Sequence, residues 1–125
     1  MKMTLAELQG GLRDGRLVSS RHVASVNDAH LDRRDQPQFA DAWMACHSRL
    51  ESVVASLSPE SRRTVDQLRE LAYRQTFQLT QNPDLAAYVS DDFGLISGAL
   101  AAGAQDPWVE YLLTCYDSGE VPSGA

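Results

Sequence analysis

The carboxyl-terminal part of this sequence lacks basic residues. All eleven lysine and arginine residues lie in residues 1–74, beside ten acidic residues, which gives that part a net charge of +1. Residues 75–125 contain seven acidic residues and no basic one, a net charge of −7. Such a segment cannot neutralise itself, so its composition disfavours nucleic acid as a partner and favours a basic protein surface.

Long apolar runs are also missing. The first residues, MKMTLAELQGGLRDGR, turn polar early and lack the apolar segment of a signal peptide, and no later run is long enough to span a bilayer. Cysteine is scarce: Cys46 and Cys115 lie far apart within apolar helical patterns, which favours buried free thiols over a disulfide or a metal site. We therefore expect a cytoplasmic protein that does not contact a membrane.

Motifs of catalysis and metal binding are absent as well. The sequence holds no P-loop, dinucleotide-binding turn or nucleophile elbow, and its three histidines lack the H-x-x-x-H spacing of zinc sites. Asp91 and Asp92 are adjacent and could share a proton or a cation, but neighbouring residues of a helix point in different directions. We expect no catalytic residue, no metal and no cofactor. A small enzyme that uses Asp91 or Asp92 with a histidine is the least favoured alternative.

Signals for helix starts are frequent. Thr4 and Glu7 form a capping-box pattern, and Ser, Asn or Asp precedes proline at positions 58–59, 82–83 and 106–107. The 125 residues, 43% apolar and 22% charged, suffice for one domain with a core. We predict an all-α, single-domain helical bundle of about five to six helices over residues 1–117, with a flexible tail over residues 118–125.

Apolar residues at spacings of three and four place the inner helices. The strongest pattern runs from Phe39 to Leu57, and we expect this helix to be the main structural spine, with Trp43 in the core. An earlier helix starts at Ser19 or Ser20 and carries His30 on its apolar stripe. The pattern thus predicts one helix for this earlier region.

The segment from residue 82 to residue 103 reads as two helices. A short helix ends near Val89, and Ser90 can cap a second helix that Gly103 closes. This division places Asp91 and Asp92 in a first helical turn, where acidic residues complement the helix dipole.

The last predicted helix, residues 107–116, is apolar on nearly every side. Its polar residues Glu110, Thr114 and Asp117 form one narrow stripe, and Asp117 and Glu120 lie where the helix dipole disfavours negative charge. We expect these acids and the aromatic residues beside them to face a partner; the alternative keeps Trp108 in the core and the acids in solvent. The expected partner-binding residues are Asp91, Asp92, Trp108, Glu110, Tyr111, Tyr116, Asp117 and Glu120.

The arginine pairs at positions 33–34 and 62–63 allow a second interpretation. Paired arginines can contact phosphates in a DNA-binding helix. Each pair has acidic neighbours, however, such as Asp32 and Asp35 beside the first pair. Ion pairs within the helix explain the arginines more simply, so DNA binding is a minor alternative.

Residues 82–122 carry a family resemblance. The strings NPDLAAYVSDDFGLISGAL and DPWVEYLLTCYDSGEVP resemble the carboxyl-terminal part of small all-helical bacterial immunity proteins of polymorphic or type VI secreted toxin systems. The resemblance implies a cytoplasmic protein that binds a cognate toxin domain and covers its active site, often through acidic residues. A small helical adaptor or accessory protein of a bacterial complex has the same composition and stays as the alternative.

Overall fold

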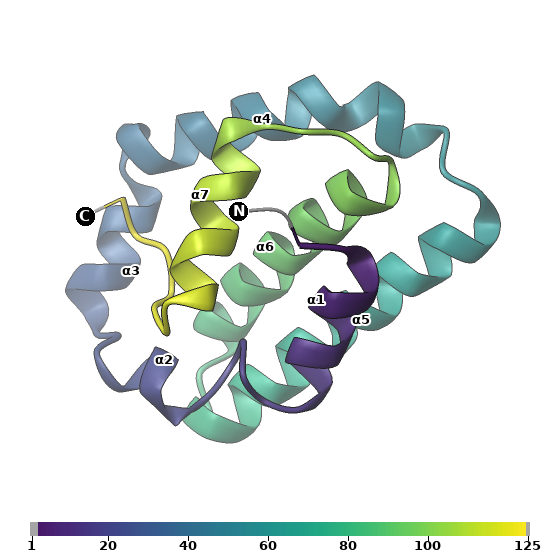
Figure 1. The fold of residues 1–125 in the computed structure, drawn as a ribbon. Helices are drawn as coiled ribbons and strands as arrows, with labels where there is room; N and C mark the ends of the chain where they lie inside the picture. The colour runs from purple at the N-terminus through teal and green to yellow at the C-terminus, as the bar shows by residue number, and fades with distance from the viewer. Residues whose placement is uncertain (1–2, 125) are drawn as a thin grey trace.

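A computed structural model describes residues 3–124, and all regular secondary structure in this range is helical (Figure 1). The predicted all-α fold is confirmed, with seven helices in the described residues instead of five or six. None of these helices is long and apolar enough to cross a membrane. The helices are α1 (Leu5–Arg13), α2 (Ser20–Ala24), α3 (Asp28–Asp35), α4 (Pro37–Ala55), α5 (Pro59–Thr80), α6 (Pro83–Ala101) and α7 (Pro107–Asp117).

The helix starts follow the local signals. The Thr4 hydroxyl accepts a hydrogen bond from the Glu7 amide at 3.1 Å, and the Glu7 carboxylate accepts one from the Thr4 amide, which completes the capping box of α1. The side chain of Asn82 accepts hydrogen bonds from two amides at the start of α6. Proline occupies the first position of four helices, where its missing N–H costs nothing.

The helix predicted to start near Ser20 is two helices. α2 ends at Ala24, and Asn27 starts α3 by accepting a hydrogen bond from the amide of His30 at 3.0 Å. An asparagine side chain can accept a hydrogen bond from a free amide at a helix start. Asn27 therefore begins a new helix within the apolar pattern that had predicted one continuous helix.

The two helices predicted between residues 82 and 103 are one continuous helix, α6. Ser90 does not cap a second helix, because its hydroxyl donates a hydrogen bond to the backbone carbonyl of Arg69 on α5 at 3.0 Å. A serine inside a helix is tolerated when its hydroxyl has such a partner. Asp91 and Asp92 therefore lie in the middle of α6 instead of in a first turn.

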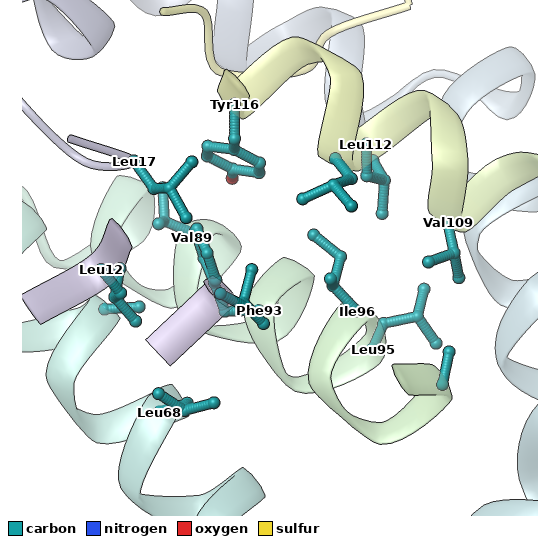
Figure 2. Packing of buried hydrophobic residues seen from close by; sticks show 14 of the residues in the cluster. Leu12, Leu17, Leu68, Val89, Phe93, Leu95, Ile96, Val109, Leu112 and Tyr116 are labelled. Atoms are coloured by element: carbon teal, nitrogen blue, oxygen red, sulfur yellow. The ribbon is translucent and has the colours of Figure 1, made fainter. Parts of the chain in front are cut away.

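The centre of the fold is α6, which packs against α1, α4, α5 and α7. Eleven of its nineteen residues are buried, whereas α4 buries three of nineteen, so the spine expected from residue 39 to residue 57 lies instead in α6. Figure 2 shows Leu112 and Tyr116 of α7 directed toward Phe93 and Ile96 of α6. Burial of these apolar side chains is the main stabilising contribution of the interior.

Residues 118–124, expected as a flexible tail, fold back onto the helices. Gly119, with a φ of 87°, allows the turn after α7, and Val121 and Pro122 are buried. The carbonyl of Pro122 accepts a hydrogen bond from Arg34 at 3.0 Å, and the amide of Gly124 donates one to the Tyr111 hydroxyl at 2.9 Å. Residue 125 of the expected tail lies outside the described residues.

Candidate functional site

A buried polar network joins α3, α4, α6 and α7 around Asp92. The Asp92 carboxylate accepts two hydrogen bonds from Arg34, both at 2.8 Å, one from the Trp43 indole at 2.9 Å and one from the Tyr116 hydroxyl at 2.6 Å. The side chains of Arg34 and Asp92 are 2% and 0% exposed. Such a paired and hydrogen-bonded charge is stable inside a protein, whereas either partner alone is not.

The network holds its members in fixed protonation states. Burial alone lowers the pKa of Arg34, but the Asp92 carboxylate outweighs it and keeps the pKa of the guanidinium above its usual value. Burial, followed by the Asp92 charge, raises the pKa of Tyr116 well above that of a free phenol. Arg34 therefore stays charged and Tyr116 stays neutral, as the hydrogen bonds require.

Burial takes two of the expected partner-binding residues away from the surface. Asp92 and Tyr116 are both 0% exposed, because their polar atoms bind within the network. Asp91 and Asp92 are also too differently placed to share a proton or a cation, because Asp91 forms an ion pair with Arg69 and Asp92 forms one with Arg34. The two carboxylates do not share a site.

The acidic carboxyl-terminal part obtains its counterions from the first part of the chain. Each of the four ion pairs recorded between side chains of residues 3–124 joins an arginine of residues 1–74 to an aspartate of residues 75–125. These ion pairs within the chain reduce the negative charge that residues 75–125 could offer to a basic partner. The pairs are Arg16–Asp117, Arg34–Asp92, Arg49–Asp106 and Arg69–Asp91.

The residues expected around α7 serve different purposes. Trp108 is partly buried, with its ring 5.1 Å from that of Phe39 and 4.9 Å from that of Tyr111. The surface hollow beside Trp108 and Tyr111 is lined by Arg33 and by no carboxylate. Glu110 and Glu120 are exposed, and neither of them lines this hollow. The expected aromatic and acidic groups of α7 therefore do not form one concave site.

Asp91 occupies a different place, where three hollows meet. The first is a pocket of about 210 Å³ between α3, α4 and α6, walled by Phe39, Trp43, Met44 and Tyr88. Met44 is 55% exposed, which is high for an apolar side chain of this size. Asp35 and Asp91 complete the lining of the pocket, together with Arg34, whose charge is already paired.

The second hollow is strongly acidic. It measures about 600 Å³ between α3 and α6, and no basic residue lines it. Tyr88 lies between this hollow and the pocket and donates a hydrogen bond to Asp35, which raises the pKa of the Tyr88 phenol to about 12. The aspartates that line the hollow are Asp28, Asp32, Asp35, Asp84 and Asp91.

The third hollow is a groove of about 630 Å³ between α4 and α5, with α6 as its floor. Its apolar lining includes Leu50, Val54, Val65 and Leu95, and Met44 also borders it. The two basic residues of its rim are engaged: Arg69 binds Asp91, and Arg62 donates a hydrogen bond to the carbonyl of Ala55.

Four of the five aspartates that line the acidic hollow were not among the expected partner-binding residues: Asp84 of α6 and the three aspartates of α3. Asp28, Asp32 and Asp35 are spaced by four and three residues, so they share one face of α3. That periodicity was the available signal. Arg33 and Arg34 were expected to form ion pairs within their own helix. Arg34 is instead buried in the interior.

The thiols and carboxylates offer little chemistry. Both cysteines are free; Cys46 is buried, and burial raises the pKa of its thiol to about 12, whereas Cys115 is partly exposed. Among the described residues, no group of three histidine, cysteine or acidic side chains could hold a metal ion. Asp106, whose pKa Arg49 lowers to about 2, accepts one hydrogen bond from the Cys46 thiol and one from the Trp108 amide at the start of α7. It has a structural role.

The class of protein follows from a comparison with protein families. The family model described as Immunity protein PIM1 matches residues 7–123, which is nearly the whole chain. The chain therefore belongs to the PIM1 family of immunity proteins. A comparison with curated proteins gives no match. Family membership agrees with the resemblance of residues 82–122 and extends it to the first five helices.

Proposed function

We propose that this protein neutralises a cognate bacterial toxin in the cytoplasm by binding the toxin domain and covering its active site. The match of residues 7–123 to an immunity protein family is the observation that carries the proposal. An immunity protein acts by binding a protein partner, and the three connected hollows around Asp91 supply a concave surface for one.

The partner surface is proposed to be basic. The chain has a net charge of −6, and the acidic hollow between α3 and α6 concentrates five carboxylates on one face. Opposite charge on a partner accelerates association and disfavours wrong partners. Nucleic acid, which is itself negative, is disfavoured by the same charge.

The first test is protection of cells from the toxin. A candidate toxin domain, sought among the products of the neighbouring genes, is expressed from an inducible promoter, with and without this protein, and growth is followed. We expect growth only when both proteins are present. The purified proteins should elute together in size-exclusion chromatography, and rising amounts of this protein should reduce the toxin's activity in proportion to complex formation. Continued growth arrest and separate elution would reject the proposed function.

A further inference from the structure

The pocket between α3, α4 and α6 combines apolar walls with carboxylates in a way that selects one kind of occupant. Its walls include the aromatic residues Phe39, Trp43 and Tyr88 and the apolar residue Met44, and Asp35 and Asp91 border it. A volume of about 210 Å³ is smaller than a typical small-molecule site, so it suits one side chain better than a separate ligand.

The charge around the pocket is negative on the side that opens toward the acidic hollow. Arg34 contributes no free positive charge, because both of its terminal nitrogens bind Asp92. Asp91 is paired only with Arg69, at 3.0 Å, and both side chains are about half exposed. An exposed pair of this kind contributes little to stability, so Asp91 can exchange Arg69 for a partner's cation at low cost.

We propose, on the basis of the proposed function, that the toxin domain inserts an arginine or lysine side chain into this pocket. The aliphatic stem packs against Trp43, Met44 and Tyr88, and the charged head binds Asp91 and Asp35. Apolar residues next to that basic residue lie along the groove between α4 and α5. A purely apolar anchor would take the two carboxylates out of water with only Arg69 and the Tyr88 hydroxyl as partners, so one negative charge would stay uncompensated, which is unfavourable.

Asp91→Lys is the main test, because it replaces the carboxylate where the three hollows meet with a like charge. Glu120→Lys is the matched control: it makes the same charge change at an exposed acid that borders none of the three hollows. Association with the purified toxin domain is measured by surface plasmon resonance over a salt series, after circular dichroism confirms each fold.

Asp91→Lys should weaken binding about 100-fold or more, with part of the loss in the association rate, because close charge pairs across interfaces couple strongly. Glu120→Lys should stay within about threefold of the parent. Met44→Glu is a second variant that leaves the buried network intact, and we expect it to weaken binding about 10-fold or more by placing a charge on the apolar wall.

The outcomes separate this inference from the proposed function. If the parent protein does not bind the toxin domain, the proposed function fails and the inference fails with it. If the parent binds and folded Asp91→Lys and Met44→Glu bind equally well, only the pocket is excluded. Loss of binding in Glu120→Lys alone would assign the interface to the α7 side. Each basic residue of the toxin domain is then replaced by alanine. For the residue that enters the pocket, this replacement should not weaken binding further when it is combined with Asp91→Lys.

Discussion

Asp92 and Asp91 are neighbours in sequence with opposite environments. Asp92 is fully buried and accepts hydrogen bonds from three different residues, whereas the Asp91 side chain is about half exposed and has one partner. Two adjacent positions of one helix thus separate a residue needed for the fold from one available to a partner.

We predict that Asp92→Asn lowers the free energy of unfolding by about 3–5 kcal/mol, because it leaves Arg34 buried without a counterion. A loss of this size is a large part of the stability of a small domain. Asp91→Asn should cost less than about 1 kcal/mol, because its ion pair is exposed. Urea unfolding followed by circular dichroism measures both. Equal stability of the two variants would contradict the assignment of Asp92 to the structural network.

His30 gives the protein a pH dependence near neutrality. It is 6% exposed, and burial, followed by the charges of Arg33 and Arg34, lowers its pKa below 6.5, with partial offset from the backbone of residues 121–122. The unfolded chain therefore binds a proton at a higher pH than the folded one does. The stabilisation is complete above about pH 6.5 and is lost as the pH falls below it.

We predict that the parent protein loses stability between pH 7.5 and pH 5.5, and that His30→Gln loses less over the same range. Thermal melts at several pH values measure the difference. His47→Gln, at an exposed histidine, is the control for the loss of an imidazole. Parallel pH profiles of the parent and His30→Gln would show that His30 is not the titrating group.

At the scale of the elements, the segment after α7 acts as part of the core. Val121 is 4% exposed, and the carbonyl of Pro122 is one of the acceptors of buried Arg34. Removing this segment exposes apolar surface under it and leaves a guanidinium N–H of Arg34 without that acceptor. It also uncovers His30, whose ring lies near the backbone of residues 121–122.

We predict that truncation after Ser118 lowers stability by about 2–4 kcal/mol, from lost apolar burial and a lost hydrogen bond to a charged group. Truncation after Pro122 keeps both features and should cost less than about 1 kcal/mol. Urea denaturation of the two truncated proteins and the parent gives the comparison. If the two truncations are equally stable, the segment is not part of the core.

The helices were predictable where the signals are local. Thr4 with Glu7, and the residues before Pro59, Pro83 and Pro107, act over two or three positions, and the sequence shows such pairs directly. The continuity of α6 depends on the Ser90 hydroxyl, whose acceptor lies 21 residues away on α5. The docking of the carboxyl-terminal segment depends on Arg34, 88 residues from Pro122. Contacts over these separations leave no periodic pattern in the sequence.

At the scale of the whole molecule, the uneven charge distribution along the chain is partly balanced by ion pairs within the protein itself. The arginines of residues 1–74 reach the aspartates of residues 75–125 in all four ion pairs recorded within residues 3–124. Composition alone suggested that the acidic part needs an external counterion, because it does not reveal which segments meet. The acidic hollow between α3 and α6 draws on both parts of the chain, because three of its five aspartates belong to residues 1–74 and two to residues 75–125.

The candidate surface was predictable only in part for the same reason. Asp91 was among the expected partner-binding residues, and it borders all three hollows. Met44 and Tyr88 were not, because a pocket arises where α3, α4 and α6 meet, and no single helix pattern contains it. Asp117 and Glu120 were expected to face a partner because the helix dipole disfavours negative charge at their positions. In the structure, Asp117 forms an ion pair with Arg16 of the same chain.

The central position of α6 also orders events during synthesis of the chain. Arg34 leaves the ribosome 58 residues before Asp92, its buried counterion, and α5 precedes the helix against which it packs most extensively. Until α6 has emerged, the first five helices have neither their central packing partner nor a carboxylate for Arg34, so they cannot reach their native arrangement alone. The pocket around Asp91 therefore forms only after α6 has been made.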